Sequence, residues 1–171
     1  MIVRPTTEAD WPALKSARLA ALLDAPTAFG VSHKQAAAQS EAQWRERAAA
    51  ADAAVPKTMF WLAFDDARQQ DEAIGIIGGG VDGHGHYNLI AMWVAPARRG
   101  AGVAQHLVDA VKARAVALGH RRIVLDVAPE NARAARFYLN QGFVFIDTWE
   151  PLASHPEIRV QKMAWLAPAL A

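Results

Sequence analysis

The stretch MWVAPARRGAGVA, from Met92 to Ala104, contains the features that decide the fold. Its first residues are apolar and predict the end of a strand, and Gly100 and Gly102 lead into a helix that starts near Val103. A strand that enters a helix through such a loop directs unpaired backbone N–H groups and the positive end of the helix dipole at one point. This arrangement favours the binding of a phosphate group.

The residues of this loop leave one other interpretation open and exclude two more. The two glycines alone also fit an ordinary strand-to-helix turn. The Gly-Lys-Ser/Thr of a nucleotide P-loop is absent, and so is the glycine triplet of a dinucleotide site.

Outward from this stretch, the periodicity of apolar residues predicts alternating strands and helices. The predicted strands are residues 1–4, 59–64, 73–78, 87–94, 123–127, 143–149 and 158–166. The predicted helices run from about Pro12 to about Leu23, and over residues 39–54, 103–118 and 132–141. The segment Gly78–His86 is rich in glycine and predicts a turn, and residues 150–157 predict a loop that contains proline.

The order of these elements indicates an α/β (α+β) fold. The early strands are joined by polar turns and predict an antiparallel meander, while strand, helix and strand over residues 87–127 predict a right-handed parallel crossover. On one face of the helix over 103–118 we expect Val103, Leu107, Val108, Val111, Ala115 and Leu118. We therefore expect a mixed, mostly antiparallel sheet flanked by helices, with residues 1–171 forming a single domain.

Composition narrows the class of function. The 171 residues include 18 Lys and Arg against 17 Asp and Glu, so the formal net charge of +1 provides no basic field for nucleic acid. The absence of cysteine excludes disulfides, a cysteine-ligated zinc site and a thiol nucleophile. No run of eighteen apolar residues occurs, and MIVRP does not resemble a signal peptide, so we expect a cytoplasmic protein without a membrane anchor whose partner is a small molecule.

A second informative stretch, NARAARFYLNQGF, covers residues 131–143. Asn131 stands where a helix N-cap belongs, and Ala134 and Tyr138 are four residues apart on one helix face. Gly142 ends the helix. Each residue also has a purely structural interpretation, with Asn131 as a cap, Tyr138 as a core aromatic and Gly142 as a helix stop.

Taken together, the two stretches resemble a known family signature. Arg-x-x-Gly-x-Ala at 99–104, followed by Asn-x-x-Ala-x-x-Phe-Tyr-x-x-x-Gly-Phe at 131–143, is similar to the acetyl-CoA signature of the GNAT superfamily of N-acetyltransferases. Ile2–Pro5, followed by Glu8–Trp11, resembles the opening strand and helix of that family. The resemblance implies the GNAT fold, in which a parallel pair of strands splays apart.

The resemblance also implies roles for individual residues. The strand end would pair with the pantetheine arm, the loop and helix start would cradle the pyrophosphate, and the capping asparagine would hydrogen-bond the cofactor. The residues so assigned are Met92, Trp93, Val94, Arg99, Gly100, Ala101, Gly102, Val103, Ala104 and Asn131. Basic residues expected beside the phosphates are Arg98, Arg99, Arg133 and Arg136.

Tyr138 is the predicted catalytic residue, because the family places this tyrosine beside the thioester sulfur. A phenol with a pKa of about 10 can protonate a departing thiolate with a pKa of about 8.5 at modest cost. The expected function is acetyl-CoA-dependent N-acetyl transfer to a primary amine of a small molecule or peptide. Because no cysteine can carry an acyl group, we expect direct attack in a ternary complex.

Two alternatives to this function stay open. One is a non-catalytic acyl-CoA-binding domain of the same fold. The other is a homodimeric interaction domain, for which the apolar tail over residues 165–171 suits a partner surface.

The sequence leaves the general base and the acceptor open. Many family members use a glutamate near the middle of the sheet, and none occurs here between Ala73 and Pro129. Candidates by position are Asp82, His84, His86, Asp126 and an ordered water. The two histidines lack further ligands at metal spacing, so no metal site is predicted. By resemblance, the acceptor would meet residues 24–31 and 150–157, and aromatic or histidine side chains that could line its pocket are Phe29, Trp61, Trp149 and His155.

Overall fold

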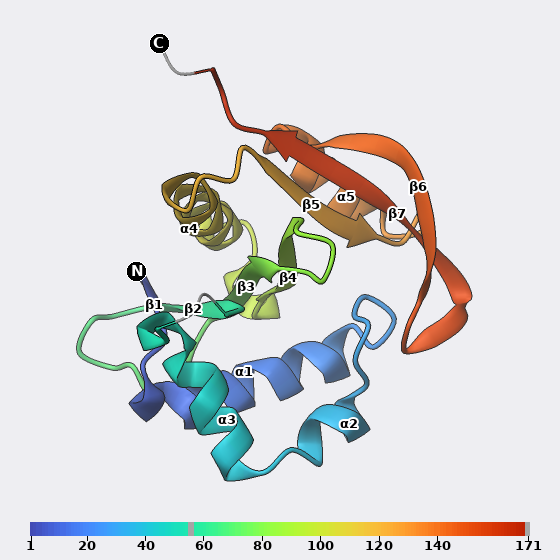
Figure 1. The fold of residues 1–171 in the computed structure, drawn as a ribbon. Helices are drawn as coiled ribbons and strands as arrows, with labels where there is room; N and C mark the ends of the chain where they lie inside the picture. The colour runs from blue at the N-terminus through green and yellow to red at the C-terminus, as the bar shows by residue number, and fades with distance from the viewer. Residues whose placement is uncertain (55–56, 170–171) are drawn as a thin grey trace.

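The computed structural model describes residues 1–54 and 57–169. Its strands are β1 (Ile2–Pro5), β2 (Met59–Phe64), β3 (Gly75–Val81), β4 (Tyr87–Val94), β5 (Arg122–Val127), β6 (Val144–Leu152) and β7 (His155–Leu166). Its helices are α1 (Trp11–Asp24), α2 (His33–Ala37), α3 (Glu41–Ala48), α4 (Val103–Ala117) and α5 (Ala132–Asn140), with 3-10 turns η1 (Glu8–Asp10), η2 (Ala49–Asp52) and η3 (Pro96–Arg98). Figure 1 shows α1, α2 and α3 gathered on one side of the sheet and α4 and α5 on the other.

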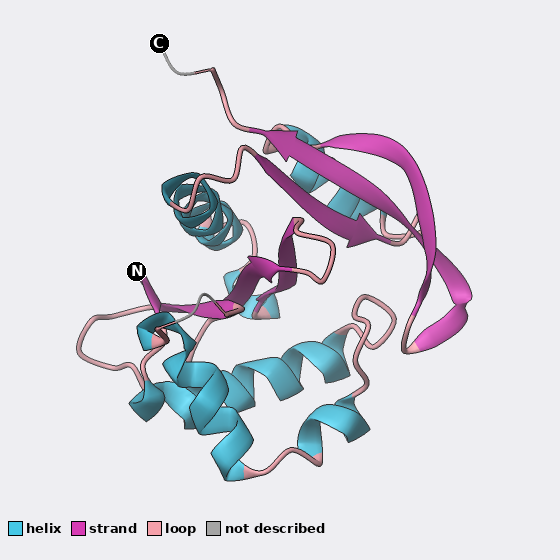
Figure 2. Ribbon diagram, viewed as in Figure 1, coloured by secondary structure: helices cyan, strands magenta, loops and turns pink. Residues whose placement is uncertain are grey.

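The strands form one seven-stranded sheet in the order β1-β2-β3-β4-β5-β7-β6 (Figure 2). All neighbours are antiparallel except β4 and β5. This parallel pair is short, since only Tyr87 with Ile123 and Asn88 with Val124 are partners. The predicted mixed, mostly antiparallel sheet with a splayed parallel pair is therefore confirmed.

The core lies on both faces of this sheet. Along β2, Phe60, Leu62 and Phe64 pack with α1 and α3, while Met59, Trp61 and Ala63 pack with α4. Successive strand residues point to opposite faces, so a strand covered on both sides is apolar throughout. The expected buried face of α4 is confirmed except at Leu118, which is 36% exposed. That residue is the C-cap, beyond the last helical turn.

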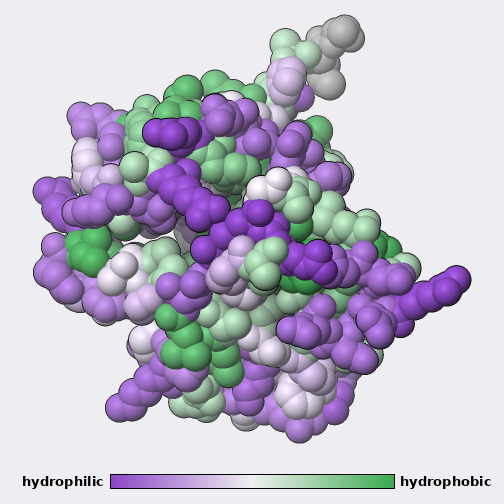
Figure 3. Space-filling view, turned by 180° about the vertical axis from the view of Figure 1, so that it is seen from behind, coloured by the Kyte–Doolittle hydropathy of each residue, from purple (hydrophilic) through white to green (hydrophobic). Residues whose placement is uncertain are grey.

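Hydrophobic groups reach the surface in separate places. On the face shown in Figure 3, hydrophilic side chains gather beside a hollow in the middle of the molecule, and hydrophobic ones form scattered patches. Within residues 1–54 and 57–169, no helix combines the length and apolarity needed to cross a membrane. In the tail singled out above, Trp165 packs against the core and Leu166 is 69% exposed, while residues 170–171 lie outside the described part of the chain.

The glycines at 78–80 belong to a strand, so the prediction of a turn there is wrong. β3 continues to Val81, and neighbouring groups occupy the space of a side chain at each glycine. A Cβ on Gly78 would lie 2.9 Å from Ile90 Cγ1, and one on Gly79 would lie 2.9 Å from the Tyr87 hydroxyl. Glycine permits turns, and it also permits other atoms to approach the backbone closely. Here the close approach explains why glycine occupies these positions.

Replacing Gly80 with alanine is expected to lower the free energy of unfolding by about 1–3 kcal/mol. The added Cβ would lie 2.8 Å from the Thr58 Cα, which is backbone and cannot rotate away. Gly83→Ala is the matched control in the adjacent turn, because no atom lies within 4 Å of its Cβ position. Urea unfolding should separate the two variants, and equal midpoints would show that the packing at Gly80 is not limiting.

The helical region before β2 is more divided than predicted. In place of one helix over 39–54, α3 ends at Ala48 and η2 follows, and the short helix α2 precedes them. Ser32 and Ser40 each cap a helix and pair with a glutamine three residues later in a capping box. This Ser-x-x-Gln spacing is a recognisable sequence signal for both starts.

The expected loop over 150–157 is also corrected, because β6 and β7 extend to a tight turn at Ala153 and Ser154. Pro151 pairs with Arg159 in this extension. Proline fits there because β6 is an edge strand. In this part of the hairpin β7 pairs with β6 alone, since its pairing with β5 begins only at Gln161.

Candidate active site

The candidate site begins where β4 and β5 separate. Beyond Asn88 and Val124 the two strands no longer pair. Trp93 and Val94 continue to pair with β3 on one side, and no described strand pairs with the other side of residues Met92–Val94. Their free backbone groups can therefore accept a ligand that binds as an added strand does.

A bulge in β4 contributes to this separation. The partner of β3 shifts from Trp93 at Ile76 to Ile90 at Gly78, so β4 carries one extra residue there. Ala91, in this extra segment, has a φ of 57° in the left-handed region, which costs about 1–2 kcal/mol for a residue with a Cβ. A bulge bends and twists its strand, here at the point where β4 leaves β5.

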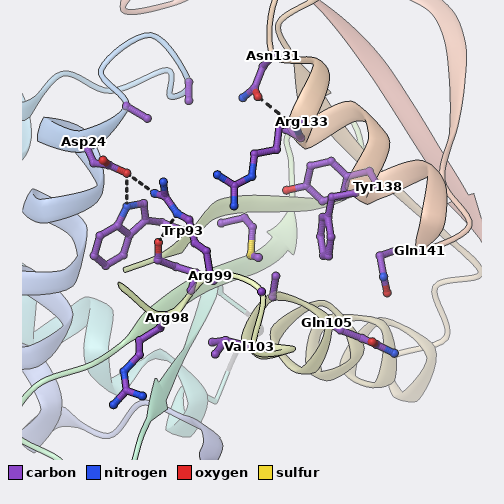
Figure 4. Close-up of a pocket in the computed structure, with 18 of the residues that line it drawn as sticks. Asp24, Trp93, Arg98, Arg99, Val103, Gln105, Asn131, Arg133, Tyr138 and Gln141 are labelled. Atoms are coloured by element: carbon purple, nitrogen blue, oxygen red, sulfur yellow. Dashed lines mark hydrogen bonds and ion pairs between the residues drawn. The ribbon is translucent and has the colours of Figure 1, made fainter. Parts of the chain in front are cut away.

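The opened strands border a cleft of about 570 Å³ (Figure 4). Every predicted cofactor residue except Ala101 lines it, and so does Tyr138. The α1–α2 loop closes one side through Asp24, Ala25, Ala28 and Phe29. Segments that are far apart in the sequence thus meet at one site.

The start of α4 has the features of an anion site. Gly100 and Gly102 have φ values of 83° and 79°, which favour glycine. Gly102 is the N-cap, and no side chain caps the first turn. The unpaired N–H groups of this fifteen-residue helix therefore face the cleft together with the positive end of its dipole.

The arginines expected beside the phosphates differ in their partners. The Arg99 Nε donates to the Val94 carbonyl at 3.1 Å, and its guanidinium also pairs with Asp24. Arg98 pairs with Asp65. Arg133 lines the cleft, and its guanidinium points toward the centre of the site in Figure 4. No acidic residue of the described chain pairs with Arg133.

Arg136 lies on α5 with Arg133, but it is exposed and does not line the cleft. Among the four arginines, Arg133 is thus the one whose charge is available to a ligand in the cleft.

Asn131 caps the start of α5, and Tyr138 lies in the last turn of the same helix. The Asn131 Oδ1 accepts from the Ala134 N–H at 3.2 Å, which confirms the cap and leaves the side-chain amide free to donate. Tyr138 is 7% exposed and makes edge-on contacts with Phe137 and Phe143. Burial raises the pKa of Tyr138 well above its ordinary value, so the phenol stays protonated. Its hydroxyl points into the cleft (Figure 4).

None of the four side chains considered as a general base lines the cleft. Asp82 organises the β3–β4 turn by accepting from the backbone N–H groups of His84 at 2.8 Å and His86 at 3.0 Å. The His86 N–H, followed by the Asn88 amide and the His84 N–H, lowers the pKa of Asp82 to about 2. Asp126 pairs with Lys162 at 2.9 Å. No group of three potential metal ligands occurs among the described residues.

The carboxylate that does line the cleft is Asp24, the first residue of the segment 24–31 that was expected to meet the acceptor; it was not among the predicted bases. Its Oδ2 accepts from the Trp93 indole N–H at 2.9 Å and from the Arg99 guanidinium. The indole and then the guanidinium hold the pKa of Asp24 below its usual range. A signal was available, because an acidic residue at the end of a helix opposes the dipole and so needs a compensating partner.

The residues expected to line an acceptor pocket are dispersed. Phe29 lines the cleft, and its carbonyl accepts from the Ser154 hydroxyl at the β6–β7 turn. His155 is adjacent, with Nδ1 3.0 Å from that hydroxyl. Trp61 is buried in the core, and Trp149 lies in a separate groove with Glu130, Glu157 and Arg159.

Solved structures similar to this one include acetyltransferases. A GCN5-related N-acetyltransferase from Kribbella flavida has a TM-score of 0.72 at 22% identity and covers 96% of each chain. A ribosomal-protein-alanine N-acetyltransferase from Brucella melitensis has a TM-score of 0.71 at 17% identity, covering 97% of this chain and 99% of that one. A putative acetyltransferase from Salmonella typhimurium, solved with acetyl-CoA, has a TM-score of 0.70 at 17% identity and covers 100% and 96%.

No curated protein matches the chain significantly. The family model described as "Acetyltransferase (GNAT) family" matches residues 19–143, which include β4, the glycine loop, α4, β5 and α5. This match spans most of the chain and includes every residue that lines the cleft, so the protein belongs to the GNAT family of acetyltransferases.

Proposed function

We propose that this chain is an acetyl-CoA-dependent N-acetyltransferase in which residues 1–171 act as one domain. The observation that carries the proposal is one cleft that combines a free strand edge, an uncapped helix start and a buried tyrosine hydroxyl. The acetyl-CoA named for the Salmonella typhimurium structure and the N-acetyl transfer named for the Brucella melitensis one support it.

The residues present fit acetyl-CoA as a substrate. The free edge of Met92, Trp93 and Val94 suits the amide groups of the pantetheine arm. The backbone from Arg99 through Gly100, Ala101, Gly102, Val103 and Ala104 suits the pyrophosphate. The Asn131 amide is placed to donate to the same ligand. Arg133 supplies a positive charge for the phosphates, because the Arg99 guanidinium pairs with Asp24.

The proposed reaction is direct attack of a neutral primary amine on the thioester carbonyl. The C–N bond forms as the C–S bond breaks, and the attacking nitrogen loses its proton to water. Tyr138 donates a hydrogen bond and then its proton to the departing sulfur, at a greater cost than for an ordinary phenol because burial raises its pKa. The phenolate then regains a proton from the water that accepted the one lost by the nitrogen. Asp24 is a poor base because its two donors favour the ionised form.

The test is the release of CoA thiol from acetyl-CoA over a panel of primary amines. Amine-dependent release, with an acetylated amine identified by mass spectrometry, is the expected result. If acetyl-CoA binds but none of the amines is acetylated, the non-catalytic acyl-CoA-binding alternative is correct instead.

Replacing Arg133 with glutamate is expected to weaken CoA binding by about ten- to a hundredfold, because a charged hydrogen bond to phosphate is replaced by repulsion. Arg136→Glu is the matched control, since it changes charge equally on the same helix but outside the cleft. Calorimetry at low and high salt measures both, and the Arg133 effect should shrink as salt rises. Equal losses in the two variants would contradict a specific phosphate contact.

A further inference from the structure

More positively charged than negatively charged side chains line the cleft. Three arginines line it, Arg98, Arg99 and Arg133, and one carboxylate, Asp24, among the described residues. Acetyl-CoA carries about three to four negative charges on its phosphates. Once acetyl-CoA is bound, the net charge in and around the cleft changes from positive to negative, and a negative net charge favours a positively charged second substrate.

Asp24 keeps one oxygen for such a substrate. Both of its hydrogen bonds, from Trp93 and Arg99, end on Oδ2, and no residue in the described chain donates to Oδ1. The side chain is 30% exposed. The carboxylate is thus fixed in orientation by two donors on one oxygen and open on the other.

The position of Asp24 adds to its preference for a cation. It is the last residue of the fourteen-residue helix α1, whose last turn contains no basic residue. The partial negative charge of the helix C-terminus therefore adds to that of the carboxylate. The loop that follows is braced near its middle, where the Phe29 carbonyl accepts from the Ser154 hydroxyl.

A contact with Asp24 would not suit the reacting nitrogen itself. An alkylammonium has a pKa of about 10.4, and a carboxylate contact would stabilise its charged form further. The attacking amine must be neutral, so an amine held by Asp24 would be slow to react. The group that Asp24 binds is therefore a different one on the same acceptor.

We propose that Asp24 binds a second, non-reacting cation of the acceptor, so that the preferred acceptors are amines with two positive charges. Diamines, polyamines and amines that carry a guanidinium belong to this class. The inference rests on the proposed N-acetyl transfer and deepens it by naming the class of acceptor.

The test compares α,ω-diamines of three to eight carbons with monoamines of equal length, by kcat/KM at saturating acetyl-CoA. The wild-type protein should favour the best diamine over its monoamine by about tenfold or more, the effect of one charged hydrogen bond. Asp24→Asn, which keeps the size of the side chain, should lower diamine turnover to the level of the monoamine. Since Asp24 also holds Arg99 and Trp93, the deciding quantity is the ratio of the two amines: the fall in kcat/KM for the diamine should exceed that for the monoamine by about tenfold.

Asp65→Asn is the matched control, since Asp65 also pairs with an arginine of the same loop but does not line the cleft. It should retain the diamine preference. If Asp24→Asn instead lowers turnover of both amines equally, or raises the KM for acetyl-CoA alone, Asp24 only positions Arg99 and the inference is overturned. Equal wild-type turnover of both amines overturns it while N-acetyl transfer stands, and no turnover of either amine overturns both.

Discussion

Replacing Tyr138 with phenylalanine is expected to lower kcat by about a hundredfold or more, the usual contribution of a positioned proton donor. The hydroxyl points into the cleft, and burial keeps it protonated, so the substitution removes the proton donor proposed for the leaving sulfur. The ring stays, and with it the packing on Phe137 and Phe143. Binding of acetyl-CoA, measured by calorimetry, should therefore be nearly unchanged.

Tyr87→Phe is the matched control for this experiment. Tyr87 is the other tyrosine of the chain, is 2% exposed, and also has its pKa raised by burial, to about 12. Its hydroxyl packs near Gly79, and it does not line the cleft. This variant should keep the wild-type kcat. If Tyr138→Phe kept it as well, Tyr138 would be a packing residue only.

Replacing Phe143 with alanine is expected to lower the free energy of unfolding by about 3–5 kcal/mol, because a fully buried ring leaves a cavity. The ring is 0% exposed, 5.6 Å from the Tyr138 ring and 5.6 Å from the Lys112 ammonium. Loss of this support should also reduce kcat in the folded variant, since Tyr138 would no longer be held. Urea unfolding and steady-state kinetics measure the two effects.

Phe145→Ala, two residues further along and in β6, provides the comparison for stability. Phe145 is 40% exposed, so its truncation should cost less than about 1 kcal/mol and leave kcat unchanged. Similar losses in the two variants would mean that burial at Phe143 does not set the stability of this end of α5.

Local sequence patterns were sufficient for most of the elements. The helical period predicted α4 and its buried face, and short apolar runs bounded by turn residues predicted β2, β4 and β5 nearly to the residue. The order of elements predicted the mixed sheet with one parallel crossover, and the family resemblance implied that the parallel pair splays. The two signature stretches predicted residues that line one cleft. These features depend on neighbours within a few residues, whose preferences the sequence contains directly.

The errors arose where a residue is explained by a neighbour distant in the chain. The glycines at 78–80 were assigned to a turn because Ile90, Tyr87 and Thr58, which occupy the space beside them, lie on other segments. For the same reason, local patterns did not predict that the Arg99 guanidinium pairs with Asp24, 75 residues earlier.

The sequence by itself thus determined the order of most elements, through local periodicity and turn chemistry, and its two signature stretches indicated the family. Only the tertiary structure decided which charged groups pair with one another. Asp24 pairs with Arg99, and the Arg133 side chain extends into the cleft. Asp82 accepts hydrogen bonds in the β3–β4 turn, and Asp126 pairs with Lys162. The physical reason is that an ion pair forms between whichever groups the fold brings within a few ångströms, and this distance depends on the packing of the whole chain.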